Sequence, residues 1–263
     1  MIPKIIHYCW FGKGVMPASQ RKLIQSWKNK MPGYQFKCWD ESNFDVHCIP
    51  YVKNAYEHKK YAFVSDYARL KALYQEGGFY LDTDIELYKS LDEFRGSDLI
   101  SGIEYFPDFE EFKQLLDENN LPKEKGTIIP YLGFLAAVIG CVQQNELIKD
   151  LIEFYDNIDK DSPDYNGIVI DGIVASMAIK YGFVYADRKQ ILNGNMMILP
   201  SRLFCSMPKE VTTESYLFHH CAQSWQPKTK NQKLQLQLDK LNLLTAYKKI
   251  TGFKRAIILR LNK

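Results

Sequence analysis

Residues 77–88 read GGFYLDTDIELY. Two glycines precede a run of aromatic and aliphatic residues that is typical of a strand. Two carboxylates, Asp82 and Asp84, interrupt that run with one residue between them. An unpaired carboxylate near an apolar core costs free energy, and two neighbouring carboxylates also repel each other. This stretch therefore either turns out into solvent or holds a cation against both acids.

The segments on both sides of this stretch alternate between helix and strand patterns. Residues 61–76 carry apolar side chains at helical spacing, and Gly77 and Gly78 are typical of a helix end. Further helices are predicted at 19–30, 145–156 and 172–181, and strands at 4–11, 35–39, 79–81, 99–102, 133–138 and 216–220. This alternation predicts an α/β fold with a mostly parallel central sheet covered by helices. Ligands of such sheets bind beyond the carboxyl ends of the strands, where Asp82 and Asp84 should lie.

Composition points to a globular protein without a membrane span. The 263 residues are 46% hydrophobic, which is enough for a sizeable core. The longest nearly uninterrupted apolar run, 131–142, is too short to cross a bilayer, and the first residues lack the pattern of a secretory signal. The six cysteines form no Cys-x-x-Cys pair, as is typical of reduced buried thiols. We therefore expect a cytoplasmic protein.

The Asp-x-Asp motif suggests a metal site but does not establish one. In extended backbone Asp82 and Asp84 project to the same side, and two hard oxygen ligands at that spacing suit Mg²⁺ or Mn²⁺. A second copy of the motif, residues 159–161, lies in a polar stretch and is interpreted as a solvated loop. By itself the first copy leaves a metal site and a surface turn equally open.

Other polar and aromatic residues also have two interpretations. Asp66 and Arg69 share one face of the predicted helix 61–76, either as a surface ion pair or as groups that hold a polar ligand. If the strand 216–220 continues, only one of His219 and His220 can face the site. Trp10 is either a core aromatic or a platform for a nucleobase.

Three segments resemble glycosyltransferase family 32. They are IPKIIHYCWFG at 2–12, FVSDYARLKALYQEGGFYLDTDIE at 63–86 and HHCAQSW at 219–225. Members of that family carry a DXD sugar-binding region and include bacterial capsular polysaccharide transferases and yeast initiating mannosyltransferases. More distantly, the same core is similar to the glucosylating domain of the large clostridial toxins. The resemblance is dense over residues 2–95 and thin over about 100–210.

This resemblance implies a GT-A fold over residues 1–227, a nucleotide-sugar donor that is usually a UDP-sugar, and Mn²⁺ or Mg²⁺. It also implies transfer with retention of anomeric configuration to a saccharide or lipid-linked oligosaccharide acceptor. By position, Trp10 would stack on the uracil, and Asp66 and Arg69 would hold ribose and sugar hydroxyls. Ser224 and Trp225 would belong to a loop that closes over the diphosphate.

The resemblance also implies the metal ligands. Asp82 would contact the ribose or sugar and share the ion, and Asp84 would be the principal ligand. The third protein ligand would be His219, although the tandem leaves His220 open. With Arg69, the two aspartates form the expected catalytic set. The region around Asp171 departs from the Gly-Pro of many relatives, so no acceptor residues are assigned there.

We therefore expect a metal-dependent retaining hexosyltransferase for galactose, glucose or N-acetylhexosamine, acting in capsular or surface polysaccharide synthesis. Two alternatives stay open. A metal-dependent nucleotidyltransferase or phosphoesterase would need further acidic ligands or a Gly-rich phosphate loop, and neither is found in the sequence. A non-catalytic sugar-nucleotide-binding protein would not need the complete set of Asp82, Asp84 and the His-Ser-Trp segment.

Positive charge is concentrated at the C-terminus. Of 34 basic and 31 acidic residues, ten basic ones and only one acidic one, Asp239, fall in 228–263, so this tail carries +9 and residues 1–227 carry −6. Leu and Ile interleave with Lys and Arg in a helical pattern, which is typical of an amphipathic membrane-surface helix. A solvated terminal helix is the alternative. The acidic body argues against nucleic acid, so we expect peripheral attachment to the inner face of the cell membrane.

The tail predicts a membrane interaction that is separable from the chemistry. Removing residues 228–263 should abolish binding to anionic vesicles, because each basic group near an anionic surface contributes about 1 kcal/mol to binding. Hydrolysis of a UDP-sugar should stay intact, because the expected donor-site residues all lie before residue 228. Vesicle co-sedimentation at low and high salt measures this. Equal binding by the full-length and shortened chains, or binding that ignores salt, would show that the tail is only a charged terminal helix.

Overall fold

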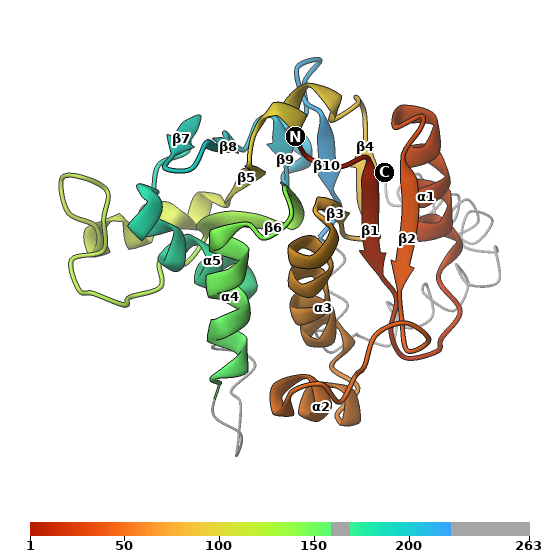
Figure 1. Cartoon of the computed structure of the whole chain (residues 1–263). Coiled ribbons are helices and arrows are strands. Elements are labelled where there is room, and N and C mark those ends of the chain that lie inside the picture. The colour runs from red at the N-terminus through yellow and green to blue at the C-terminus, as the bar shows by residue number, and fades with distance from the viewer. Residues whose placement is uncertain (159–168, 222–263) are drawn as a thin grey trace, which may run out of the picture.

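A computed structural model of the chain describes residues 1–158 and 169–221 (Figure 1). Ser224, Trp225, the second Asp-x-Asp motif and the basic tail all lie outside these residues, so the expectations for them stay predictions. None of the described helices is long and apolar enough to cross a bilayer.

Helices and strands alternate along the chain as the sequence predicts. The strands are β1 (Ile5–Cys9), β2 (Gln35–Trp39), β3 (Gly78–Leu81), β4 (Ile85–Leu87), β5 (Leu99–Tyr105), β6 (Leu132–Cys141), β7 (Gln190–Leu192), β8 (Met196–Leu199), β9 (Phe204–Cys205) and β10 (Leu217–His219). The α-helices are α1 (Ala18–Lys30), α2 (Pro50–Glu57), α3 (Tyr61–Glu76), α4 (Glu146–Asp156) and α5 (Ile170–Ala178). Short 3₁₀ helices are η1 (Asp92–Gly96), η2 (Pro107–Leu115), η3 (Ile179–Tyr181) and η4 (Pro208–Glu210).

A seven-stranded sheet forms the centre of the described part of the chain, in the order β2-β1-β3-β6-β5-β8-β7. Five of these strands run in the same direction, and β6 and β7 run against them, which confirms the mostly parallel sheet. A smaller sheet has the order β4-β10-β9. In Figure 1 the arrows of β1 and β2 point downward, so the carboxyl ends of the parallel strands lie at the lower edge.

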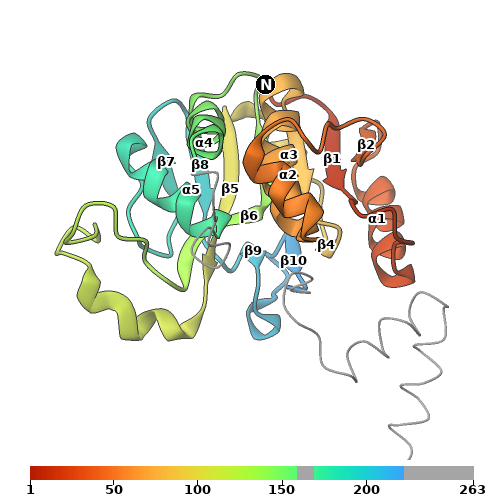
Figure 2. The same ribbon diagram turned by 90° about the horizontal axis from the view of Figure 1, so that it is seen from below.

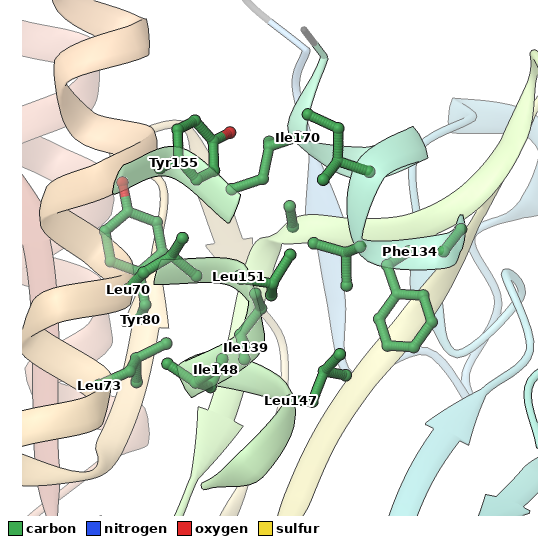
Figure 3. Packing of buried hydrophobic residues seen from close by; sticks show 14 of the residues in the cluster. Leu70, Leu73, Tyr80, Phe134, Ile139, Leu147, Ile148, Leu151, Tyr155 and Ile170 are labelled. Carbon is green, nitrogen blue, oxygen red and sulfur yellow. The ribbon is translucent and has the colours of Figure 1, made fainter. Parts of the chain in front are cut away.

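Helices α3, α4 and α5 cover one face of the large sheet. Figure 3 shows Leu70 and Leu73 of α3 packed against Ile148 and Leu151 of α4, with Ile139 of β6 beneath them. All five side chains are buried. The apolar positions of helices 61–76 and 145–156 read from the sequence therefore do form a single core.

Helix α1 and the smaller sheet cover the opposite face. Trp27 of α1 is fully buried, and its indole N–H donates to the carbonyl of Ile85 at 2.8 Å. Leu217 of β10 and Phe204 of β9 belong to the same apolar cluster. The small sheet is thus held against the large one by side-chain burial as well as by the chain connection.

The Gly-Gly pair turns the chain from α3 directly into β3. Gly77 and Gly78 have φ of +62° and +99°, which L side chains rarely adopt. A Cβ at Gly78 would also lie 2.7 Å from the carbonyl oxygen of Ile5. Only glycine lets β3 lie this close to β1, so this step fixes where the Asp82–Asp84 turn emerges.

Strand β6 changes register beside β5. Ser101 pairs with Ile139, but Ile103 pairs with Phe134, so β6 has more residues than β5 between the two pairings. We call residues 135–138 the β6 bulge. Its backbone groups on the β5 side lack the regular ladder partners of a strand and must be satisfied in another way.

Side chains satisfy the backbone of the β6 bulge. Ser101 donates its hydroxyl to the carbonyl of Leu135 at 3.1 Å. The N–H of Ala136 donates to Asp171 Oδ1, and the carbonyl of Ala136 accepts from Arg69 Nη1, both at 2.8 Å. Three polar residues from β5, α5 and α3 therefore converge on one point of the sheet.

Arg69 also ties the bulge to the Asp-x-Asp turn. Its Nη2 lies 2.8 Å from Asp66 Oδ1 and 3.5 Å from Asp82 Oδ1, and its guanidinium carbon is 4.5 Å from the centre of the Tyr80 ring. Arg69 and Asp66 are 4% and 6% exposed, so the interpretation of a surface ion pair was wrong. The pair lies on the face of α3 that packs on the sheet, where water cannot solvate it.

Replacing Arg69 by methionine should destabilise the protein by about 3–5 kcal/mol, because the change leaves buried Asp66 without its cation. It also leaves the Ala136 carbonyl without its donor. Urea unfolding measures this. The control Arg188→Met, at an exposed position, should change stability by less than about 0.5 kcal/mol. A loss below about 1 kcal/mol in Arg69→Met would contradict the central role of this guanidinium.

Candidate active site

The two aspartates lie in a turn and not on an extended strand. Strand β3 ends at Leu81, the N–H of Asp82 donates to the carbonyl of Ala137 at 2.9 Å, and the N–H of Ile85 donates to the carbonyl of Asp82 at 3.0 Å. The expectation that the alternation of a strand aligns Asp82 and Asp84 was therefore wrong. The chain has to cross here from the large sheet to the small one, and the turn itself brings the carboxylates together.

The small sheet adds a histidine to the two aspartates. Strand β10 runs antiparallel to β4 and pairs His219 with Ile85, next to the turn. His219 Nε2 lies 3.4 Å from Asp84 Oδ1. One possible ligand atom from each of Asp82, Asp84 and His219 can be chosen so that all three lie within 4.8 Å of one another. Residues far apart in the sequence thus form one compact group.

The structure distinguishes the tandem histidines. His219 points toward the turn, and its side chain is mostly buried, like that of Asp84. His220 follows the last residue of β10, and its side chain points away from the Asp82–Asp84 turn. Its Nε2 lies 3.1 Å from Glu86 on the exposed side. The backbone N–H of His220 donates to the carbonyl of Asp84 at 3.2 Å, but of the two imidazoles only that of His219 lies beside a carboxylate of the Asp82–Asp84 turn.

His219 is held between an acid and a thiol. Its Nδ1 lies 3.4 Å from the sulfur of Cys221, and its Nε2 faces Asp84. Burial alone would lower the pKa of His219, but its hydrogen bonds with Asp84 and Cys221 raise the pKa well above the usual value. Asp84 is therefore a strong enough acceptor to keep positive charge beside it, which is also what a cation would supply.

Two neighbouring side chains, Tyr80 and Arg69, orient the carboxylate of Asp82. The Tyr80 hydroxyl donates to Asp82 Oδ1 at 2.7 Å, and Arg69 lies beside the same oxygen. Burial raises the pKa of Asp66 to about 7, and Arg69 opposes that shift. The carboxylate of Asp82 is thus positioned by two buried side chains, while its own side chain keeps partial contact with solvent.

Sequence reasoning missed Glu104 and Asp171 as members of this site. Glu104 lies near the carboxyl end of β5, and its carboxylate forms a second possible ligand group with His219 and Cys221. Asp171 lies in the first turn of α5 and accepts from the β6 bulge. The available signals were an acid just before the last residue of the run LISGIEY and an Asp-Gly step at a helix start.

Glu104 and Asp171 lie on either side of one glycine. Glu104 pairs with Gly133 of β6, and a Cβ at Gly133 would lie 2.9 Å from the backbone oxygen of Asp171. Burial is the main cause that raises the pKa of both acids, and the charge of Asp171 raises that of Glu104 further. The edge of the sheet therefore concentrates carboxylates that a cation would stabilise.

Trp10 follows β1 directly and borders a cavity of about 300 Å³ that Arg21 and Asp40 also line. Its backbone N–H donates to the carbonyl of Trp39 at 2.9 Å. The preceding residue, Cys9, is close enough to Arg69 and Asp82 for their charges to act on its pKa, which burial raises. Trp10 is half-buried and lies at the boundary between core and cavity, so it is not a fully buried core aromatic, and its role as a platform for a nucleobase stays a prediction.

The group Asp82, Asp84 and His219 fits a divalent cation. It offers carboxylate oxygens, which Mg²⁺ and Mn²⁺ prefer, and one imidazole nitrogen. Its ligand atoms converge within 4.8 Å, at a sheet edge where the acids outnumber the neighbouring bases. This arrangement can bind a metal ion and, through it, an anionic ligand.

Residues 17–100 match the family model described as "Glycosyltransferase sugar-binding region containing DXD motif". An uncharacterised glycosyltransferase of Acanthamoeba polyphaga mimivirus is 32% identical over 105 residues, which cover 36% of this chain and 41% of the viral protein. Subversion of eukaryotic traffic protein A of Legionella pneumophila is 28% identical over 111 residues, which cover 32% of this chain and 17% of that protein. The aligned regions thus span less than half the length of either curated relative.

Among solved structures, the PaToxG glycosyltransferase matches 68% of this chain and 69% of its own length, with a TM-score of 0.52 and 17% identity. At that identity the likeness concerns the fold, and it agrees with the mostly parallel sheet flanked by helices. The family match supplies the DXD motif, which is Asp82-Thr83-Asp84 at the turn described above. The described part of the chain therefore has the GT-A fold, and residues 17–100 match the DXD-containing sugar-binding region of glycosyltransferases.

Proposed function

We propose that this protein transfers a hexose from a UDP-sugar to a saccharide acceptor, with retention of configuration and with Mn²⁺ or Mg²⁺ as cofactor. One observation carries the proposal: the possible ligand atoms of Asp82, Asp84 and His219 converge within 4.8 Å at the carboxyl edge of β3. Ligands of α/β sheets bind at that edge, and the diphosphate of a nucleotide sugar is an anion that such a group can hold through a metal ion.

Each residue of the site has a distinct task in this proposal. Asp84 and His219 would hold the cation and Asp82 would share it; such an ion would supply Lewis-acid stabilisation of the negative charge on the departing diphosphate. Asp66 and Arg69 would lie beneath the ribose and sugar hydroxyls of the bound donor. Because their polar atoms already bond to each other and to the β6 bulge, they act on the donor mainly by orienting Asp82.

The chemical step needs no protein nucleophile. The acceptor hydroxyl forms a bond to the anomeric carbon on the face from which UDP leaves, the bond from that carbon to the diphosphate oxygen breaks, and the hydroxyl proton passes to the departing diphosphate. The protein contributes by holding the two reactants in place and by excluding water. Ser224 and Trp225 would close over the diphosphate for that purpose.

Trp10 would hold the nucleobase. It borders a cavity beside the end of β1, and its neighbour Cys9 is close to Asp82. An indole next to a hollow of this kind can stack on a uracil ring. In this proposal the base would lie on the α1 side of the sheet edge and the sugar would lie toward Asp82.

The wider role is also part of the proposal. We assign residues 1–227 to the catalytic domain and 228–263 to a basic tail that binds an anionic membrane from the cytoplasmic side. A lipid-linked saccharide at that surface would be the acceptor, as in capsular or surface polysaccharide synthesis. The charge of +9 on the tail against −6 on the rest of the chain supports this assignment.

The direct test measures UDP release from UDP-glucose, UDP-galactose and UDP-N-acetylglucosamine, with Mn²⁺, with Mg²⁺ and with a chelator. Transferases of this kind hydrolyse their donor slowly when no acceptor is present. We expect metal-dependent release from one of these donors. No release and no binding of any of them would overturn the proposal, and binding without release would favour a non-catalytic sugar-nucleotide-binding protein.

Asp84→Asn should reduce metal-dependent UDP release by about a hundredfold or more. Mutating a residue that only hydrogen-bonds to a metal ligand already lowers metal affinity or activity by about 10–100-fold, and Asp84 would be a ligand itself. The amide keeps the shape of the side chain but removes the anionic ligand. Calorimetric titration with Mn²⁺ should show the matching loss of metal binding, and circular dichroism should show an unchanged fold. Full Mn²⁺-dependent turnover in Asp84→Asn would remove Asp84 from the metal site.

The tandem histidines provide a matched control for the metal site. His219→Gln should lose metal binding and UDP release together, whereas His220→Gln, next to it in the chain but on the exposed side of β10, should keep both. Equal metal binding and equal UDP release in the two variants would show that His219 is not a metal ligand.

Trp10→Ala should weaken UDP binding by about 1–3 kcal/mol, the usual contribution of one base stacked on an aromatic ring. Trp10→Phe keeps a ring and should recover most of the affinity. Equilibrium titration of UDP in the presence of Mn²⁺ measures both variants. Unchanged affinity in Trp10→Ala would show that this tryptophan serves only the packing around β1.

A further inference from the structure

A second cavity, of about 430 Å³, lies beyond the carboxyl end of β5. We call it the Tyr105 cavity. Its aromatic lining consists of Tyr105, Phe109 and Tyr185, and its polar lining includes Glu110, Asn120 and Asp187. The volume falls within the range of about 300–1,000 Å³ that is typical of small-ligand sites.

One residue of the cavity wall is the chain neighbour of a residue at the DXD site. Tyr105 follows Glu104, whose carboxylate lies within 4.8 Å of possible ligand atoms of His219 and Cys221. Tyr105 pairs with Leu132 where β5 and β6 meet, and both residues line the cavity. In Figure 2 the yellow-green segment that contains η2 lies at the periphery near α5 and β7, on the far side of the molecule from α1. The segment η2, which supplies Phe109, Glu110 and Lys113 to the cavity, therefore lies on the opposite side of the described chain from α1.

Aromatic rings form much of the cavity wall. The rings of Tyr105 and Phe109 meet edge to face with centres 6.0 Å apart. Phe109 and Tyr185 are buried beneath the opening. The Tyr185 hydroxyl lies near the backbone of Ile129 but makes no hydrogen bond of normal geometry with the described residues. Flat apolar walls beside such polar groups suit ligands with both an apolar face and hydroxyl groups.

The charges of the cavity argue against a phosphate ligand. Lys113 lies 2.8 Å from Glu110 and is already paired, and the Tyr105 hydroxyl donates to the same Glu110 at 3.2 Å. Asp187 accepts two hydrogen bonds from Ser201, each of 2.7 Å. Two carboxylates and one paired ammonium repel a diphosphate, but carboxylates are good acceptors for hydroxyl groups. The chemistry favours a neutral polyhydroxylated ligand.

We propose that the Tyr105 cavity binds a neutral sugar unit of the acceptor, with Tyr105 against an apolar face of the sugar and Glu110, Asn120 and Asp187 accepting or donating to its hydroxyls. This inference rests on the proposed transferase function, because it takes the DXD site as the place of the donor. The acceptor then reaches the donor past Glu104, at the carboxyl end of β5.

The test observes sugar binding directly on the full chain. The probes are methyl glycosides of glucose, galactose, mannose and N-acetylglucosamine at millimolar concentration, followed by saturation-transfer NMR. We expect at least one probe to bind, and to stay bound when UDP and Mn²⁺ are present at saturating concentration. Displacement of every bound probe by UDP would assign the sugar to the donor site and overturn the proposal.

Two variants locate the bound sugar. Ala186→Trp fills the cavity and should abolish probe binding, while metal-dependent UDP release stays unchanged. Glu110→Gln should weaken binding about tenfold, as expected for the loss of one hydrogen bond to a charged group. The control Glu111→Gln changes the neighbouring exposed acid, which does not line the cavity, and should have no effect. If Ala186→Trp impairs folding, the Glu110 and Glu111 pair decides.

The outcomes separate this inference from the proposed function. UDP release without binding of any glycoside would support the transferase function and overturn the sugar site. An acceptor that proves to be a protein side chain would also overturn the sugar site. Sugar binding that depends on Ala186 and Glu110 without any UDP release would overturn the transferase activity and leave the saccharide site in place. Binding that survives in both variants would place the sugar elsewhere.

Discussion

The buried guanidinium of Arg69 is the interaction on which the rest of the site depends. A charge with 4% exposure has to be paired and hydrogen-bonded, and Arg69 meets this need by joining Asp66, Asp82 and the carbonyl of Ala136. These partners come from α3, from the end of β3 and from the β6 bulge. Satisfying one cation therefore fixes where three elements meet, and it positions the first aspartate of the DXD motif at the same time.

The crossing between the two sheets creates the chemical site. β3 belongs to the large sheet and β4 to the small one, so the chain crosses from one sheet to the other at the Asp82–Asp84 turn. Strand β10 then brings His219 to the turn from the far end of the described chain. Burial is the main cause that raises the pKa of nearby Glu104 and Asp171, and the charge of Asp82 raises both pKa values further. A bound cation would favour the charged forms of these acids, and raised carboxyl pKa values of this kind are common at functional sites.

Long periodic segments were predictable from the sequence, and short ones were not. The helix over 61–76 and the strand over 35–39 match α3 and β2, because several turns or alternations make the period visible. Strands β4, β7 and β9 have three, three and two residues, which is too short for any period, and α2 begins at Pro50 without a predicted pattern. The Asp82–Asp84 pair was identified, but Glu104 and Asp171 were not, since a lone acid carries no signal of its neighbours.

The sequence by itself determined the α/β class, the DXD motif and the resemblance that predicts a glycosyltransferase, because these depend on local order along the chain. Only the tertiary structure decided which tandem histidine faces the motif, that the Asp66–Arg69 pair is buried, and that the aspartates lie in a turn. Those properties depend on pairing between strands that are far apart in the chain, β4 with β10 and β3 with β6. A pattern along one segment records which face is apolar, but it does not record which partner covers that face.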